Sequence, residues 1–338
     1  MNRIEPRLRM ALDLNAPAQT GSGSAGDCGA RPCKSSFVEH GRVLGSLAGL
    51  RRTRRPKKME AIMSGKDAVE LGSVQKTLLL PLWGRAIETR KARPLLVDRT
   101  AARIIESINY DFSTIARNIS FISQLSWVAR SLHTDRTIRE FLEQHPDATF
   151  VNLGCGLDTT FERVDNGRLS WYDLDLADVI ELRKRYIQEG GRRTSIACSL
   201  LDDGWLGKLK AADSIFFLAS GVFYYLEEVQ IKAFLIKLAN ALPGSEVLFD
   251  ACSPRGVGLA NRKVIKAGGM DDSAVLKWGL QRARDMESWD SRITVVAEYP
   301  MFRNIKRGLS IRDRLGMFVS DALNMMSMVH LRLGIRPV

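Results

Sequence analysis

No stretch of this 338-residue sequence has about 18 consecutive apolar residues, the length that a helix needs to cross a bilayer, so a membrane-spanning helix is not expected. Residues 1–19 also lack the continuous apolar centre of a signal peptide. Hydrophobic residues make up 45% of the chain and charged residues 26%, as in an ordinary soluble globular protein. These features predict a cytoplasmic protein long enough for a sizeable core.

Cysteine and histidine are scarce as well, with five and four residues in the whole chain. Cys28 and Cys33 lie close together, but no second pair and no nearby histidine accompany them, so no zinc site is expected. The other three cysteines fall in or beside predicted buried strands, which favours free thiols in a reducing compartment. All four histidines are interpreted as structural rather than catalytic: His40, His133, His145 and His330.

Residues 1–72 lack the regular apolar spacing of helices or strands, and Gly, Ser, Ala and Pro dominate residues 16–30. They are predicted to form a disordered, basic, low-complexity extension. The basic run from Arg51 to Lys58 can bind nucleic acid or an anionic membrane, but we favour a solvated arm. Because Met59 and Met63 stand just before the first patterned segment, a start-site artefact is a further hypothesis for residues 1–62.

Residues 73–338 are predicted to form one α/β domain. Amphipathic spacing predicts an N-terminal helical layer over 73–147, with helices at 74–89 (broken at Pro81 and Gly84), 101–108, 112–129 and 134–142. Strands and helices alternate over 148–253, the predicted ligand-binding core, and lid helices and the last strands fill 254–338.

The alternation predicts five strands joined by helices, and residues 293–298 and 325–333 read as two late strands around a helix at 311–323. The expected fold is therefore a doubly wound, mostly parallel, seven-stranded sheet whose last two strands form a hairpin-like pair. Two further helices are expected at 256–268 and 272–285.

The most informative stretch lies in the middle of the chain. Residues 149–153 read as a buried strand entering a turn with Gly154 and Gly156, and residues 169–174 read as the next strand, which ends at Asp175. Glycines after a strand let the backbone approach a ligand without interference from a Cβ atom. An acid about 20 residues further on can accept hydrogen bonds from both hydroxyls of a ribose, and the spacing here fits.

The third glycine of the dinucleotide motif G-x-G-x-x-G is absent, because Thr159 stands in its place. Asp158 lies near the N-terminus of the following helical segment, where a carboxylate interacts well with the helix dipole but repels a phosphate. The ligand is therefore interpreted as a nucleoside without a phosphate, of which S-adenosylmethionine is the common example. An ordinary turn with two glycines stays open as the alternative.

Longer segments resemble a known family. The sequence VNLGCGLDTTFERV, followed by WYDLDLADVIELR, resembles the leucine carboxyl methyltransferase family, and within it the bacterial polyketide O-methyltransferases. Three more segments, TLLLPLWGRAIETR, WVARSLHTDRTIREFL and FFLASGVFYYLEEVQ, resemble the family in the same order. The resemblance covers roughly residues 74–334. It implies a Rossmann-like class I methyltransferase sheet, S-adenosylmethionine as the methyl donor and an oxygen, often a carboxylate, as the acceptor.

By position, the resemblance implies that Arg130 pairs with the methionine carboxylate of the donor, a role that suits the planar fork of a guanidinium. It also implies that Asp175 holds the ribose hydroxyls and that residues 199–201 flank the adenine. The predicted donor-binding residues are Arg130, Gly154, Cys155, Gly156, Asp158, Leu174, Asp175, Ser199, Leu200, Leu201 and Ser220.

Two positions depart from the family pattern. Ser199 and Ser220 stand where many members carry an acid, and the glutamate expected at position 220 would hold the ammonium group of the donor. A serine brings no charge, so weaker donor binding is one hypothesis. Replacement of the acid at position 199 by Asp202 or Asp203 is another.

Tyr225 is the candidate for contacting the acceptor, because it follows a strand at the carboxyl edge of the sheet; a packed aromatic residue is the equal alternative. Arg85 and residues 255–290 are candidates for a lid. A carboxylate acceptor is ionised at neutral pH and needs no general base, whereas a phenol or alcohol needs one, most often histidine. The scarcity of histidine therefore favours a carboxylate.

Three alternatives stay open at this point. Ser199 and Ser220 suggest a non-catalytic protein that binds the donor or a partner. An NAD-dependent oxidoreductase is disfavoured by the missing third glycine, and a nucleic-acid modifier is suggested only by the basic arm. The expected partner is a small-molecule acceptor, without a membrane or a metal ion, and the sequence predicts no oligomeric state.

Overall fold

The computed structural model describes residues 73–210, 212–266, 274–305 and 309–334, all within the part of the chain from Gly65 to Val338. The predicted disorder of residues 1–72 and the basic run lie outside the described residues. Among those that are described, no helix combines the length and the apolar character needed to cross a bilayer.

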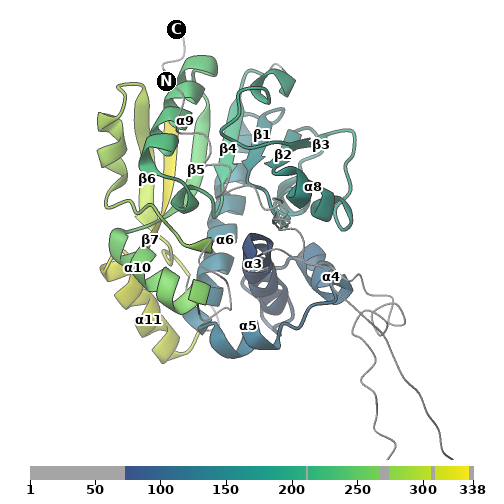
Figure 1. Ribbon diagram of the computed structural model, residues 1–338, viewed down its shortest axis with the longest axis vertical. Helices are drawn as coiled ribbons and strands as arrows, with labels where there is room; N and C mark the ends of the chain where they lie inside the picture. The colour runs from purple at the N-terminus through teal and green to yellow at the C-terminus, as the bar shows by residue number, and fades with distance from the viewer. Residues whose placement is uncertain (1–72, 211, 267–273, 306–308, 335–338) are drawn as a thin grey trace, which may run out of the picture. The chain divides into compact units, whose positions relative to one another are not determined.

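Seven strands form one sheet in the order β3-β2-β1-β4-β5-β7-β6 (Figure 1). β1 to β5 are parallel to one another, and β7 runs antiparallel to both of its neighbours, β5 and β6. The predicted seven-stranded, mostly parallel, doubly wound sheet with an antiparallel last pair is confirmed. The strands are β1 Thr149–Leu153, β2 Ser170–Asp175, β3 Arg193–Ala197, β4 Ile215–Ala219, β5 Glu246–Cys252, β6 Ile293–Pro300 and β7 Met326–Leu333.

The described α-helices are α3 Ser73–Thr89, α4 Arg99–Ser107, α5 Ser113–Asn118, α6 Phe121–Gln144, α7 Phe161–Val164, α8 Ala177–Lys184, α9 Glu228–Ala241, α10 Pro254–Ala260 and α11 Ile311–Ala322. Shorter helical segments are η1 Leu206–Lys208, η2 Phe223–Tyr225, η3 Asn261–Lys266 and η5 Ala283–Ser288. α6 packs on the sheet, and α3 packs with α4 and α6. A separate helical layer over 73–147 stays a prediction.

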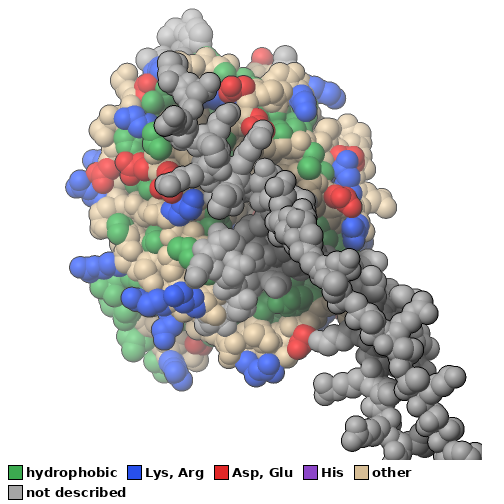
Figure 2. Space-filling view, viewed as in Figure 1, with side chains coloured by type: hydrophobic (Ala, Val, Ile, Leu, Met, Phe, Trp, Pro, Cys, Tyr) green, Lys and Arg blue, Asp and Glu red, His purple; other side chains and the backbone are tan. Residues whose placement is uncertain are grey.

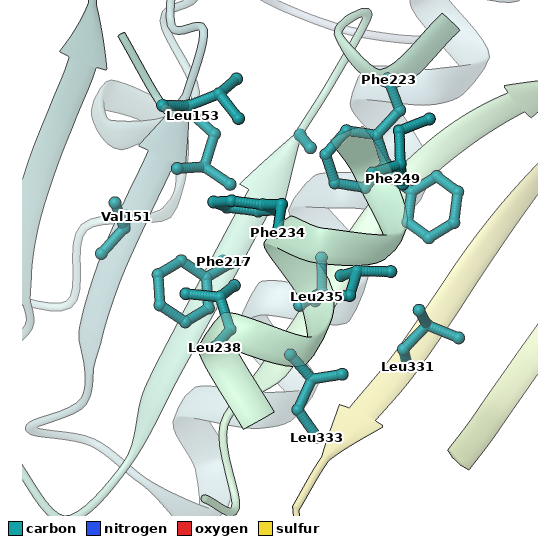
Figure 3. Close-up of a cluster of buried hydrophobic side chains, with 14 of the residues drawn as sticks. Val151, Leu153, Phe217, Phe223, Phe234, Leu235, Leu238, Phe249, Leu331 and Leu333 are labelled. Carbon is teal, nitrogen blue, oxygen red and sulfur yellow. The ribbon is translucent and has the colours of Figure 1, made fainter. Parts of the chain in front are cut away.

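The two faces of the sheet bury alternate residues of each strand, as the period of two in a β-strand requires. On one face, Val151 of β1 and Phe217 of β4 belong to the same apolar cluster as Phe234 and Leu238 of α9 (Figure 3). On the other face, the neighbouring strand residues pack with α6. Polar residues of β1, β2 and β5 that continue this second alternation lie on the same face of the sheet as α6: Asn152, Asp173 and Asp250.

The predicted break at Pro81 and Gly84 is wrong, because α3 is continuous through both residues. Proline costs the helix one backbone hydrogen bond, but the neighbouring residues Leu79, Leu80 and Leu82 are buried and hold the helix in place. A Cβ atom at Gly84 would lie 2.8 Å from Cε3 of Trp127, so this glycine lets α3 approach α6 closely.

The predicted division of 112–142 into one helix at 112–129 and another at 134–142 is also wrong. α6 runs without interruption from Phe121 to Gln144, and the actual boundary is Ser120, whose side chain accepts a hydrogen bond from the backbone N–H of Ser123. Residues 130–133 lie mid-helix and are buried or nearly so, because α6 crosses the sheet at this point.

The predicted helix at 272–285 is wrong over 275–282, which have no helical structure, whereas 283–285 belong to the 3₁₀ segment η5. The backbone N–H groups of Lys277 and Trp278 both donate to the carbonyl of Tyr224, at 2.7 and 3.2 Å, and that of Leu280 donates to the carbonyl of Cys252. Hydrogen bonds to distant loops thus replace those of a helix. The expected helix at 256–268 is present as α10 and η3, up to residue 266.

Candidate functional site

The turn after β1 is held in a left-handed conformation by two glycines. Gly154 and Gly156 have φ angles of +57° and +47°, in a region that side chains strongly disfavour. A Cβ atom on Gly154 would lie 2.7 Å from Val222, and one on Gly156 would lie 2.8 Å from Leu78. The bare backbone of this turn is therefore wedged between α3 and the loop that follows β4.

Asp175 joins this turn to the end of β2, as the sequence predicts. Its Oδ2 accepts the N–H of Gly156 at 2.7 Å, and its Oδ1 accepts the N–H of Leu176 at 2.8 Å. Burial raises the pKa of Asp175 to about 6, although these two hydrogen bonds act in the opposite direction. Nearby, the carbonyl of Leu174 accepts the N–H of Cys155 at 3.1 Å, so four predicted residues lie together.

Arg130 reaches the same edge of the sheet from α6. Its Nη1 donates to Oδ2 of Asp250 at 2.9 Å and to the hydroxyl of Tyr224 at 3.3 Å. Oδ1 of Asp250 accepts the N–H of Gly221 at 2.6 Å, in the loop directly after β4. The Arg130–Asp250 ion pair is buried, with side-chain exposures of 9% and 0%. The only described hydrogen bonds of Arg130 use Nη1, which leaves Nε and Nη2 as donors for a ligand.

Asp158 is tied into the turn itself. Its carboxylate accepts hydrogen bonds from the N–H and hydroxyl of Thr160 and from the side-chain amide of Asn152. Burial raises the pKa of Asp158, but Arg85, Arg163 and these hydrogen bonds outweigh it and hold the pKa at about 2. The negative charge that argues against a phosphate is therefore present.

Two buried arginines behind the turn were missed by the sequence reasoning. Arg183 donates to the carbonyl of Gly156 at 2.7 Å and to Asp173 at 2.9 Å. Asp173 also accepts a hydrogen bond from Arg193 at 2.7 Å. These contacts fix the carbonyl of Gly156, while Asp175 binds the N–H of the same residue. The sequence signal was the pair of acids in WYDLDL, of which Asp173 is the structural one.

Arg85 is not part of a lid. Its Nε donates to Asp98 at 2.9 Å, its Nη2 donates to the carbonyl of Leu157 at 3.1 Å, and its side chain is 4% exposed. Asp98 also binds Arg163 at 2.9 Å, and Arg163 forms a bidentate pair with Asp135 of α6. This network connects α3, α4, α6 and α7 to the turn after β1.

The two serines differ in their surroundings. Ser199 accepts the N–H of Leu201 on its hydroxyl, and its own N–H donates to the exposed Asp202 at 3.1 Å. Leu200 is buried beside them, and its carbonyl accepts the indole N–H of Trp205. Asp203 instead pairs with Lys237 at 2.6 Å and is 93% exposed. Of the two acids that could replace an acid at position 199, only Asp202 contacts Ser199.

Ser220 is partly buried and precedes Gly221. Although position 220 carries no acid, the carboxylate of Asp250 lies against the same turn through its bond to Gly221. The sequence analysis assigned no role to Asp250. Its role depends on a contact between residues 120 positions apart, which no local pattern reveals.

Tyr225 lies in η2 beside this turn, partly buried, with its ring 5.1 Å from that of Tyr224. Burial raises the pKa of Tyr225 to about 12, while Arg130 and a hydrogen bond with Thr77 of α3 act against the rise. The tyrosine thus connects α3 to the ends of β4 and β5.

The three described histidines are engaged in structural contacts. His133 bonds to the carbonyl of Met301 at 2.9 Å, and burial lowers its pKa to about 4, so its ring is neutral and donates from Nε2. His145 bonds to Ser214, and His330 bonds to Glu246.

The arrangement fits a nucleoside that also carries an amino acid group. In α/β folds, ligands bind at the carboxyl edge of the parallel sheet. Three features lie at this edge here: the turn with Gly154 and Gly156, the carboxylate of Asp175 at the end of β2, and the buried guanidinium of Arg130, whose Nε and Nη2 are not used by the described hydrogen bonds. Among the residues that the structure describes, no phosphate-binding set accompanies them, since Asp158 is charged and Thr159 occupies the third glycine position, donating its hydroxyl to Asp98.

Comparisons with known proteins agree with this geometry. The family model for leucine carboxyl methyltransferase matches residues 79–239. The tetracenomycin polyketide synthesis O-methyltransferase TcmP of Streptomyces glaucescens is 34% identical over 224 residues, which cover 66% of this chain and 81% of that protein. The S-adenosyl-L-methionine-dependent methyltransferase dpfgK of Gibberella zeae is 31% identical over 207 residues, or 55% of this chain and 68% of the relative.

Among solved structures, a DUF574 family protein from Streptomyces avermitilis aligns with a TM-score of 0.50 at 10% identity, covering 76% of this chain and 97% of that one. Fold and relatives together define a class I S-adenosylmethionine-dependent methyltransferase. The chain belongs to the leucine carboxyl methyltransferase family. The oxidoreductase and non-catalytic alternatives are thereby set aside.

Proposed function

We propose that this enzyme transfers a methyl group to an oxygen of a small polyketide-like molecule, and that the oxygen belongs to a carboxylate. The observation that carries the oxygen acceptor is the 34% identity to a polyketide O-methyltransferase over most of that relative's length. When bound, S-adenosylmethionine supplies a methyl group on a sulfonium, whose sulfur departs as a neutral sulfide.

In this proposal the donor is held by residues at the ends of β1, β2 and β3 and by Arg130 of α6. The carboxylate of Asp175 accepts both ribose hydroxyls, and Nε and Nη2 of Arg130 pair with the methionine carboxylate. The backbone of the turn around Cys155 lies against the donor, and Leu174, Ser199, Leu200 and Leu201 border the adenine. Holding the donor in this way leaves positioning of the acceptor as the main task of catalysis.

Asp250 compensates for the missing acid at position 220. It is a fully buried carboxylate that touches both Arg130 and Gly221. Its charge balances the guanidinium and directs Nη1 away from the ligand, while the hydroxyl of Ser220 accepts a hydrogen bond from the donor ammonium group.

The choice of a carboxylate acceptor rests on the absence of a suitable base among the described residues at this edge. His133 is occupied by Met301, and Asp250 is occupied by Arg130. A phenol with a pKa of about 12, as in Tyr225, stays protonated at neutral pH and therefore donates a hydrogen bond instead of taking a proton. An acceptor that is already ionised needs no base.

A product screen tests this proposal. The enzyme is incubated with donor carrying an isotopically labelled methyl group and with matched pairs of aromatic polyketide acids and their phenolic analogues. We expect base-labile methyl esters from the acids and no label on the phenols. Methyl ethers from the phenols, with no esters, would contradict the carboxylate assignment.

Tyr225→Phe separates contact with the acceptor from simple packing. Loss of the hydroxyl should raise KM for the acid and leave the donor affinity unchanged, because the ring still packs against Tyr224. An unchanged KM would make Tyr225 a packing residue.

We further propose that the enzyme acts in the cytoplasm on a free small molecule, without a nucleic-acid or membrane partner. The free thiols of Cys155, Cys198 and Cys252 support a reducing compartment. Cell fractionation tests the location, and salt-sensitive binding of the full chain to nucleic acid would contradict the absence of that partner.

A further inference from the structure

Arg130 is a buried cation, so its hydrogen-bond donors need acceptors inside the protein or on a ligand. Figure 2 shows Lys and Arg side chains spread over one face of the molecule, where water can solvate their charge. The side chain of Arg130, in contrast, is only 9% exposed. Its Nη1 carries two hydrogens and has two described acceptors, Oδ2 of Asp250 at 2.9 Å and the hydroxyl of Tyr224 at 3.3 Å. Asp250 and Tyr224 together therefore fix the orientation of the guanidinium.

The hydroxyl of Tyr224 lies against the turn that follows β4. A Cβ atom on Gly221 would lie 2.9 Å from Nη1 of Arg130 and 3.2 Å from this hydroxyl. The φ angle of Gly221 is +79°, which also favours glycine. A side chain at position 221 would crowd both groups, so the bare backbone allows the phenol and the guanidinium to lie next to each other at the turn.

The proton of the Tyr224 hydroxyl has no acceptor among the described residues. The oxygen accepts a hydrogen bond from Arg130, and no described carbonyl or carboxylate receives the O–H in turn. Burial and the charge of Asp250 raise the pKa of Tyr224 well above its usual value, although Arg130 acts against the rise, so the hydroxyl keeps its proton at neutral pH. A phenol can accept and donate at once, and a buried one usually finds a partner. One unused donor therefore lies beside the guanidinium.

We propose that Tyr224 is a further residue of the donor site, whose hydroxyl donates a hydrogen bond to the methionine carboxylate of S-adenosylmethionine. The inference rests on the proposed function, in which Nε and Nη2 of Arg130 hold that carboxylate. A carboxylate oxygen has more than one lone pair, so it can accept from the guanidinium and from the phenol together. In this arrangement Tyr224 contacts the methyl donor, and its neighbour Tyr225 contacts the acceptor.

Tyr224→Phe removes the hydroxyl and keeps the other contacts of the residue. The ring still packs in its buried cluster, and the backbone carbonyl still accepts the N–H groups of Lys277 and Trp278. Calorimetry of the full chain compares S-adenosylmethionine with its decarboxylated analogue, which keeps the ribose, the sulfonium and the ammonium group. We expect Tyr224→Phe to weaken binding of S-adenosylmethionine about tenfold, the loss of a hydrogen bond to a charged group, and to leave binding of the analogue nearly unchanged.

Replacement of Tyr224 by 3-fluorotyrosine separates contact with the ligand from orientation of Arg130 alone. The more acidic phenol is a stronger hydrogen-bond donor and a weaker acceptor. Binding of S-adenosylmethionine should therefore become tighter if the hydroxyl donates to the carboxylate. Weaker binding would mean that the hydroxyl only accepts from Arg130, and would overturn the contact.

Tyr299→Phe is the matched control, because it removes a buried hydroxyl of β6 that has no partner among the described residues. It should leave both affinities unchanged. Equal affinity of the wild type for the two ligands would overturn the placement of the carboxylate at Arg130, and this inference with it. If the wild type prefers S-adenosylmethionine, an unchanged affinity in Tyr224→Phe, or an equal loss with both ligands, overturns the role of Tyr224 alone.

Discussion

Asp175 is the residue on which the proposed donor site depends most. Its carboxylate accepts hydrogen bonds from two backbone N–H groups and is raised in pKa to about 6 by burial. Because folding favours the protonated form, Asp175 contributes stability at low pH that is lost as the pH rises through about 6. In the proposed donor site, binding should have the opposite dependence, since only the ionised form can accept hydrogen bonds from both ribose hydroxyls.

The affinity for S-adenosylmethionine should therefore fall roughly tenfold between pH 7.5 and pH 5, one unit below this pKa. Isothermal titration calorimetry across that range measures the change. Asp175→Asn cannot ionise, and its weaker affinity should show no such slope. A slope that persists in Asp175→Asn would assign the titration to another group.

Arg130 should not tolerate replacement by lysine. An ammonium group lacks the planar fork that allows Arg130 to bind Asp250 and a second carboxylate together. We expect Arg130→Lys to weaken donor affinity by about 10- to 100-fold, the effect of losing a hydrogen bond to a charged group. Arg136→Lys, on an exposed position of the same helix, is the control and should bind the donor normally. Equal affinities for both variants would exclude the proposed role.

At the scale of secondary-structure elements, the network around Asp98 fastens the N-terminal helices to the turn after β1. Burial raises the pKa of Asp98, but Arg85, Arg163 and its hydrogen bonds outweigh it, so the pKa is lowered. Asp98 therefore stabilises the fold above its unfolded pKa, and this stability is lost as the pH falls through the lower folded pKa.

Asp98→Asn should lower the free energy of unfolding by about 3–5 kcal/mol, since it leaves two buried arginines without their shared carboxylate. Urea denaturation at neutral pH measures the change. Asp147→Asn breaks an exposed pair with Arg168 and should leave the midpoint nearly unchanged. Similar midpoints for both variants would mean that the buried network does not hold the elements together.

The elements also show where sequence reasoning succeeds and fails. Gly154, Gly156 and Asp175 were predictable because one strand-turn-helix-strand unit brings them together. The non-helical course of 275–282 was not, since it depends on carbonyl groups of Tyr224 and Cys252 far away in the sequence. The Arg130–Asp250 pair likewise joins residues 120 positions apart, and α6 is continuous only because the sheet buries its middle.

At the scale of the whole molecule, the order of the strands explains why distant segments form one site. β1 lies between β2 and β4 in the sheet, so the carboxyl ends of these strands and of β5 are neighbours. The end of each strand, or the loop after it, contributes one part: the turn with Gly154 and Gly156, Asp175, Gly221 and Asp250. Arg130 completes the set from α6, which lies on the face toward which Asp250 points.

The central claim is that this edge of the sheet holds the methyl donor through Asp175 and Arg130. Calorimetric titration of the full chain with S-adenosylmethionine tests it most directly, comparing the wild type with Asp175→Ala and with Asp203→Ala, a change at a 93% exposed side chain. We predict one donor per chain for the wild type and Asp203→Ala, and at least a tenfold loss of affinity in Asp175→Ala. Equal donor affinity in all three proteins would contradict the account.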